Sequence, residues 1–183
     1  MTELLRHAFS WVCGQNPAHT WSPGGVLLPL CQRCTGVYVG ACIAAPLHLA
    51  WRPVPTPRWL WLNGAFLLFI IPSGFYWIPQ NAELRCTSGI LFGFGLVAFL
   101  WLTLQRKNET ESTKNSRPQL AAFAASLFAA LVLTPMIGEY GNAAAAGILM
   151  VACVAGALAL AALLLANLFF FLRWAGRIFA HAA

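Results

Sequence analysis

The chain has 183 residues, of which 60% are hydrophobic and only 9% are charged, with a net charge of +6. Soluble domains have about 45–50% apolar and about 25% charged residues, so this composition excludes an ordinary soluble enzyme and a disordered chain. All five acidic residues are glutamates, which excludes any mechanism that needs an aspartate. The remaining class is an all-α, polytopic membrane protein.

Residues 1–33 are predicted to form an N-terminal segment outside the membrane spans. This segment carries Cys13, His19 and a C-x-x-C pair, Cys31 and Cys34, at the start of the first apolar run. Two cysteines three residues apart at a helix start are able to bind one metal ion or to form a redox-active disulfide. Cys13 supplies a third sulfur, and the candidates for a fourth ligand are His19, His7 and Cys86. A structural disulfide and simple packing of the thiols are the alternative interpretations.

Five apolar stretches are long enough to form spanning helices, each of which needs about 20 residues. They lie at about 34–51, 59–78, 86–104, 119–137 and 143–172. We therefore predict a three-span core over 34–104 and a two-span C-terminal hairpin with a short tail over 119–183. The hydrophilic stretch 105–118 is expected to be a cytoplasmic loop between them.

The distribution of lysine and arginine predicts the orientation of these five spans. One side would carry eight basic residues: Arg52, Arg58, Arg106, Lys107, Lys114, Arg117, Arg173 and Arg177. The other side would carry three: Arg6, Arg33 and Arg85. Because basic loops stay in the cytoplasm, we expect the N-terminus outside and the C-terminus inside, in a multi-pass protein of the cell (inner) membrane.

The basic residues lie in short loops and form no patch, so they do not indicate a nucleic-acid partner. The predicted partner is the lipid bilayer. The same topology collects the cysteine cluster, Arg33 and Arg85 at the outer face. Most other basic residues are assigned to the inner side.

The sequence at the start of the first span is repeated at the start of the third. Residues 33–40, Arg-Cys-Thr-Gly-Val-Tyr-Val-Gly, correspond to residues 85–93, Arg-Cys-Thr-Ser-Gly-Ile-Leu-Phe-Gly, with one inserted serine. Each copy contains a Gly-x-x-x-Gly pair, Gly36/Gly40 or Gly89/Gly93, and small residues four apart let two helices approach closely. We expect the two spans to pack as a parallel pseudo-repeat whose Arg, Cys and Thr residues meet at the outer face. A homodimer through these small-residue faces is the other arrangement that the pattern permits.

Four polar residues near the outer face form a candidate site for a small anion: Arg33, Thr35, Asn81 and Arg85. Arginine side chains bind phosphate or carboxylate groups in pairs. The alternative is that each arginine simply extends to the membrane interface.

Two motifs in this region resemble an uncharacterised prokaryotic membrane family, domain of unknown function 2085. Residues 28–40, Leu-Pro-Leu-Cys-Gln-Arg-Cys-Thr-Gly-Val-Tyr-Val-Gly, match the family motif Pro-x-Cys-x-Arg-Cys-Thr-Gly-x-Tyr-x-Gly. The segment that begins at Cys13 departs from the family, because Gly14 stands where a histidine is typical and His19 where an arginine is typical. The resemblance covers roughly residues 13–93 and implies no established activity.

Three functions remain open from the sequence. The first is an outer-face site that binds a transition metal (zinc, iron or copper) or a small anionic ligand. The second is a membrane thiol–disulfide oxidoreductase that passes electrons from Cys31 and Cys34 to a quinone. The third is a non-catalytic scaffold with a structural cysteine cluster. Whether the protein is an enzyme is left open.

Overall fold

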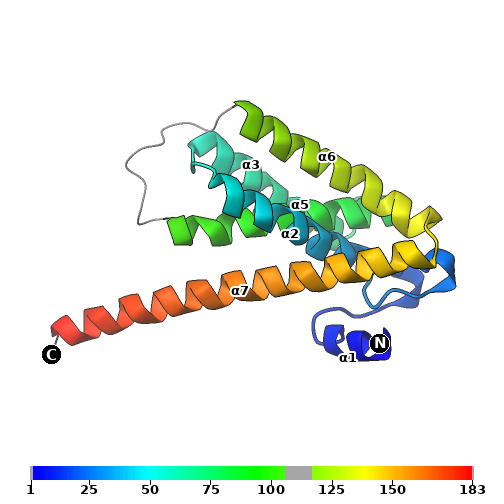
Figure 1. Ribbon diagram of the computed structural model, residues 1–183, viewed down its shortest axis with the longest axis horizontal. Coiled ribbons are helices and arrows are strands. Elements are labelled where there is room, and N and C mark those ends of the chain that lie inside the picture. Colours follow the sequence, from blue (N-terminus) through cyan, green and yellow to red (C-terminus); the bar gives the residue numbers. More distant parts are fainter. Residues whose placement is uncertain (1, 106–116, 183) are drawn as a thin grey trace.

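The computed structural model describes residues 2–105 and 117–182, and within these ranges the chain forms helices and no strand. The α-helices are α1 (Thr2–Phe9), α2 (Gln32–Trp51), α3 (Pro57–Leu68), α4 (Ile70–Gly74), α5 (Ala82–Gln105), α6 (Arg117–Tyr140) and α7 (Ala143–Ala182). Two short 3-10 helices, η1 (Pro17–His19) and η2 (Pro23–Gly25), lie between α1 and α2. The protein is a helical membrane bundle, as the sequence predicts (Figure 1).

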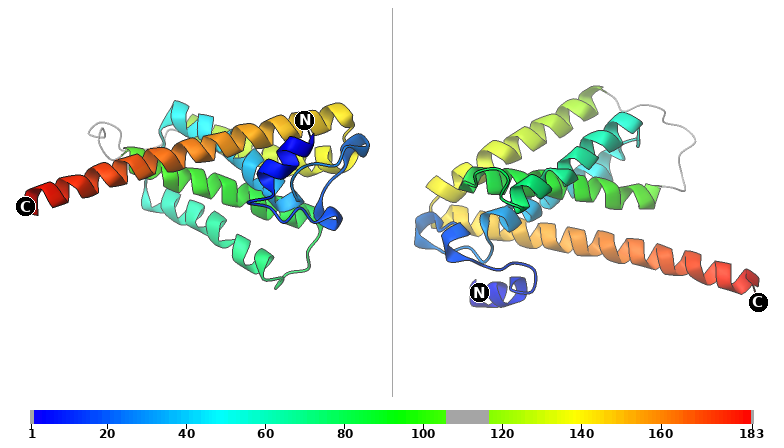
Figure 2. Two further views of the ribbon diagram at one scale, coloured as in Figure 1. Left: turned by 90° about the horizontal axis from the view of Figure 1, so that it is seen from below. Right: turned by 180° about the vertical axis from the view of Figure 1, so that it is seen from behind.

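The chain passes along the bundle five times. At one end, which we call the cysteine end, Arg33 on α2 is hydrogen-bonded to Ser73 on α4. At the opposite end, which we call the far end, the ring of His48 on α2 lies 6.2 Å from the ring of Trp59 on α3. The segment from α3 to α4 therefore runs antiparallel to α2, between the two ends (Figure 2).

The second of these passes differs from the prediction of five single spanning helices. Only α2, α5, α6 and α7 are, in the described residues, long and apolar enough to cross a membrane alone. The stretch predicted at 59–78 forms two shorter helices, α3 with 12 residues and α4 with 5. Pro72 explains the break, because it has no N–H to offer the carbonyl of Leu68.

The other four predicted spans agree with the helices to within about four residues, except at the C-terminal end of the last one. Helix α7 has 40 residues, which corresponds to about 60 Å of helix and exceeds the roughly 30 Å hydrocarbon core. It extends past the rest of the bundle (Figure 1). The predicted hydrophilic loop falls mainly on residues 106–116, outside the described residues.

Helices α2 and α5 make the most extensive contact in the bundle, and glycines permit it. A Cβ atom added to any of the four Gly-x-x-x-Gly glycines would lie closer than 3.0 Å to a carbonyl oxygen of the opposite helix. The pairs are Gly36 with Cys86, Gly89 with Arg33, Gly40 with Ile90, and Gly93 with Val37. The small-residue faces of α2 and α5 are thus used within one chain.

The contact has an internal two-fold relation. Gly36 faces the carbonyl of Cys86, and Gly89 faces the carbonyl of Arg33. The two glycines are 53 residues apart, and so are the two residues that they face, so each half of the contact repeats the other. With this shift of 53 residues Arg33 falls on position 86, one residue after Arg85, because of the inserted serine. One residue rotates a side chain by about 100° around a helix, so Arg33 and Arg85 do not occupy equivalent positions. The two Arg-Cys-Thr triplets are therefore offset by one residue relative to the glycines. The glycines carry the repeat.

Candidate metal centre

Three cysteine side chains come together at the cysteine end. The sulfur atoms of Cys13, Cys31 and Cys34 all lie within 4.8 Å of one another. Cys31 is the extended residue that precedes α2, and Cys34 lies in the first helical turn, so that the C-x-x-C spacing directs both toward one side. Cys13 comes from the loop after α1, and 18 residues separate it from Cys31.

The loop between α1 and α2 is held in place by hydrogen bonds that bring Cys13 back to the helix start. The backbone N–H of Cys31 donates to Cys13 Sγ at 3.3 Å. Gln15 Nε2 donates to the carbonyl oxygens of Arg6 at 2.6 Å and Pro29 at 3.0 Å. Gln15 has a positive φ of 47°, which turns the chain at this point. Cys13 therefore occupies a defined position rather than the tip of a free loop.

The surroundings of Cys13 favour a thiolate. Hydrogen bonds from the side chains of Cys31 and Cys34, and then from the backbone N–H of Cys31, hold the pKa of Cys13 far below its ordinary value of 9.0. The positive end of the α2 dipole acts in the same direction. All six cysteines are free thiols. Because the thiolate is the form that binds a metal ion, Cys13 is suited to coordination.

The spacing of the sulfurs fits a thiolate-bound metal ion. Metal–sulfur bonds of about 2.3 Å place the sulfurs of one ion about 3.8–4.0 Å apart, so a small contraction of the group would suffice. Cys13 is buried, whereas Cys31 and Cys34 are partly exposed, which leaves one side of the group accessible. Thiolate ligands favour soft or borderline ions such as Cu(I), Zn²⁺ and iron.

The residues predicted as a fourth ligand do not join the group. His19 lies at the end of η1 and Cys86 is fully buried in α5 at the contact with Gly36. His7 is exposed on α1. Within the part of the chain that the structure describes, the cluster of ligating side chains consists of the three cysteines.

Arg33 neighbours the cysteines in sequence, and the Nη2 atom of its guanidinium group binds protein, whereas its Nε is buried without a hydrogen-bond partner. Its Nη2 donates to the Ser73 carbonyl at 2.9 Å, to Ser73 Oγ at 3.3 Å and to Gln80 Oε1 at 3.2 Å. Ser73 Oγ also donates to Ser88 Oγ at 3.0 Å. This network, whose two serines are fully buried, ties α2, α4 and α5 together behind the cysteine group.

The other members of the predicted anion site have separate partners. Arg85 Nη1 lies 3.5 Å from Gln32 Oε1, and Asn81 Oδ1 accepts from the N–H of Leu84 at 2.7 Å as the cap of α5. Thr35 is fully buried between helices. Asn81 thus serves as a helix cap, Thr35 Oγ1 has no hydrogen-bond partner, and binding of an anion by these residues stays a prediction.

Sequence reasoning missed the residues that hold the N-terminal loop against α6 and α7. The ring of Trp21 lies against Gly138 on α6, where a Cβ atom would clash with it. Gly24, with φ of 59°, approaches the backbone of Ala143 at the start of α7. The Pro-Gly-Gly sequence of η2 signals a turn, but nothing in the sequence indicates what it contacts.

Comparison with known proteins places the chain in a family without assigning an activity. The family described as "Predicted membrane protein (DUF2085)" matches residues 13–99, which contain the cysteine group, the Arg33 network and the glycine contact. An uncharacterized protein of Methanothermobacter thermautotrophicus is 46% identical over 95 residues, which cover 48% of this chain and 83% of that protein. No solved structure matches the chain significantly. The chain belongs to the DUF2085 family of predicted membrane proteins.

Proposed function

We propose that Cys13, Cys31 and Cys34 bind one transition metal ion, which is zinc, iron or copper, at the end of the bundle that faces the outside of the cell. The observation that carries this proposal is the meeting of three sulfurs from two separate segments within 4.8 Å. Three protein ligands with an accessible side are typical of sites that keep an open position for water or a substrate. A small anionic ligand would bind at that open position.

The alternative is a thiol–disulfide oxidoreductase that uses Cys31 and Cys34 and a membrane quinone. A C-x-x-C pair at a helix start is suited to this chemistry. The third sulfur favours the metal site over this alternative. Thiol–disulfide exchange needs only two thiols and gives no role to Cys13, which a hydrogen bond from the N–H of Cys31 holds next to the pair.

Metal content of the purified protein tests the proposal. We expect about one ion per chain in the wild type and less than about a tenth of that in Cys13→Ser, Cys31→Ser and Cys34→Ser, because each variant leaves only two thiolates. The measurement is mass spectrometry of the metals in protein purified without chelators. Cys42→Ser is the matched control, since Cys42 is also a partly exposed thiol of α2 but lies outside the group.

The same samples distinguish the alternatives. A metal-free wild type with a Cys31–Cys34 bond that dithiothreitol reduces would contradict the metal site and support the oxidoreductase. A metal-free wild type with free thiols would support the scaffold. Equal metal in the wild type and the three variants would place the ion elsewhere.

The orientation is a separate part of the proposal. The excess of basic residues beside the far end supports a cytoplasmic far end and an external cysteine end. We expect a fluorescent protein that matures only in the cytoplasm to be bright when fused after Ala183, and alkaline phosphatase fused there to be inactive. An active phosphatase at this position would reverse the orientation and place the cysteines inside.

A further inference from the structure

The short helix α1 lies against the flank of the bundle at the cysteine end. The ring of Phe9 on α1 packs against the ring of Tyr38 on α2, with centroids 5.4 Å apart. A Cβ atom on Gly156 of α7 would lie closer than 3.0 Å to the carbonyl oxygen of Tyr38, so α7 passes α2 at the same level. Figures 1 and 2 show α1 beside α7 and set back from the end of the bundle. Helix α1 therefore lies next to two spanning helices and not above them.

The position of Tyr38 along α2 gives the depth of this contact. Helix α2 has 20 residues, which correspond to about 30 Å, the thickness of the hydrocarbon core. Tyr38 lies six residues after Gln32, the first residue of α2, which is about 9 Å along the helix. Helices that lie in a membrane surface bury their apolar face about 5–10 Å into the boundary between headgroups and acyl chains. The contact of α1 is at that depth.

The side chains of α1 and of the turn after it divide into three faces. Leu5 and Phe9, four residues apart, pack against the bundle. Leu4 and Trp11, seven residues apart, form a second face that is apolar and 75% and 85% exposed. Trp11 stays on this face because the N–H of Cys13 donates to the Phe9 carbonyl at 3.0 Å, which continues the helical turn. The third face is polar and exposed, and it consists of Glu3, His7 and Ser10.

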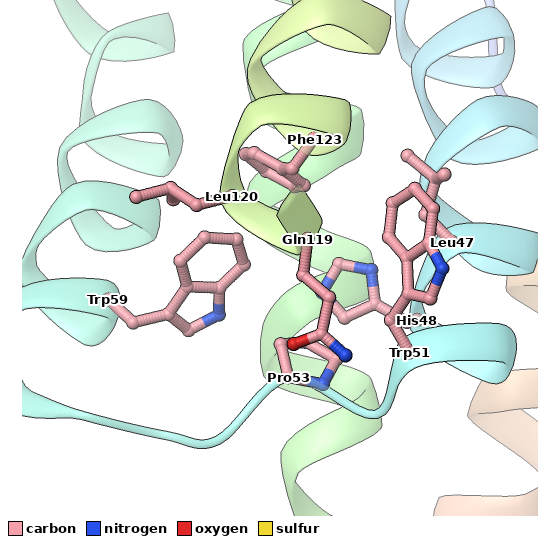
Figure 3. Close-up of a pocket in the computed structure, with 8 residues that line it drawn as sticks. All are labelled: Leu47, His48, Trp51, Pro53, Trp59, Gln119, Leu120 and Phe123. Atoms are coloured by element: carbon pink, nitrogen blue, oxygen red, sulfur yellow. The ribbon is translucent and has the colours of Figure 1, made fainter. Parts of the chain in front are cut away.

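The exposed indole of Trp11 differs from an indole that packs inside the bundle. At the far end, Trp59 is 8% exposed and its ring lies edge to face with Phe123, with centroids 4.5 Å apart (Figure 3). Trp11 instead presents its ring outward. Tryptophan is enriched where membrane meets water, because its ring is apolar and its N–H is polar.

A second group of exposed aromatic side chains lies at the cysteine end. Phe75, Tyr76 and Trp77 follow α4, whose Ser73 accepts hydrogen bonds from Arg33. All three are more than half exposed, and the rings of Phe75 and Trp77 stack with centroids 5.9 Å apart. Aromatic residues on two separate segments at one end of a bundle are typical of the belt at a membrane surface.

We propose that α1 lies in the membrane surface at the cysteine end, with Leu4 and Trp11 in the lipid and the polar face in water. The apolar face is too small for a stable protein partner, which needs about 800 Å² on each side, whereas an aromatic side chain buries about 150–250 Å². Lipid already covers the exposed side chains of the neighbouring α7, so it continues onto α1. Because Cys13 follows the same turn, this contact places the cysteine group at the boundary of lipid and water. The contact does not depend on a bound metal ion.

Photocrosslinking of the full chain in phosphatidylcholine nanodiscs tests the proposal. The photoreactive residue p-benzoylphenylalanine, which bonds to nearby C–H groups on illumination, is placed singly at Leu4, Trp11, His7 and Ser10. All four side chains are exposed, so the substitutions leave the packing of the bundle intact. Mass spectrometry should show at least about five-fold more lipid adduct from positions 4 and 11 than from positions 7 and 10, because only the apolar face meets acyl chains.

Ile148 on α7 provides the positive control. It is an exposed residue of a spanning helix, so the same probe at this position should give lipid adducts. Equal lipid adducts from the two faces of α1 would overturn the proposal. So would an absence of adducts at positions 4 and 11 in samples where position 148 reacts. Products that join two chains through positions 4 and 11 would show that a second copy covers this face and would contradict the lipid contact.

Discussion

Replacing Gly36 or Gly89 with alanine is expected to lower the free energy of unfolding by about 3 kcal/mol, near the upper end for overpacked sites. At either position the added Cβ would lie closer than 3.0 Å to a carbonyl oxygen of the opposite helix. Both atoms belong to helical backbone, so no side chain is able to move aside and α2 and α5 must separate. Reversible unfolding in mixed detergent micelles measures the change.

Gly147→Ala provides the matched control. Gly147 also lies in a long apolar helix, but a Cβ there meets nothing within 4 Å. The substitution should be neutral or stabilising by up to about 1 kcal/mol, since alanine favours the helix. The double variant Gly36→Ala/Gly89→Ala should lose less than the sum of the single variants, because helices already separated have room for the second Cβ. Equal stability of Gly36→Ala and Gly147→Ala would contradict the close α2–α5 contact.

Replacing Arg33 with methionine is expected to lower the free energy of unfolding by about 3 kcal/mol. The substitution keeps the length of the side chain but removes the donor that serves Ser73 and Gln80. Hydrogen bonds from a charged group contribute about 1.5–3 kcal/mol each, and the Ser73 carbonyl would be left buried without its donor. The loss should also free α4, and hydrogen exchange at residues 70–74 should speed up.

Arg85→Met is the comparison that separates a structural arginine from an interfacial one. Arg85 makes one long contact of 3.5 Å with Gln32 and lies in the first turns of α5. We expect a loss below about 1 kcal/mol. If the two variants were equally stable, the buried network would not be what holds α4 to α2.

The sequence was sufficient for the class of fold and for the helix contact that organises it. Hydropathy located the long helices, and the spacing of Gly36, Gly40, Gly89 and Gly93 identified the face on which two of them meet. The break between α3 and α4 was harder to predict from the sequence. A proline such as Pro72 kinks some membrane helices and ends others, depending on the neighbouring helices. The rotation between Arg33 and Arg85 follows from one inserted serine, yet only the register of the glycines shows which residues correspond.

The candidate metal centre was predictable in part. The C-x-x-C pair is local, so its geometry follows from the start of a helix, but the position of Cys13 depends on a loop that Gln15 holds and that Trp21 packs against α6. Those long-range contacts leave no periodic signal in the sequence. The orientation of Arg33 was not predictable for the same reason, because hydrogen bonds to Ser73 and Gln80 direct its side chain toward α4.

X-ray absorption at the edge of the bound metal tests the central claim most directly, because it reports the ligands of the ion. For the purified protein loaded with zinc, we predict three sulfur neighbours at about 2.3 Å, together with at most one lighter atom from water. Cys13→Ser should lose one of the three sulfurs or the whole ion. A first shell made of nitrogen and oxygen, or a spectrum of three sulfurs unchanged in Cys13→Ser, would contradict a metal centre built from Cys13, Cys31 and Cys34.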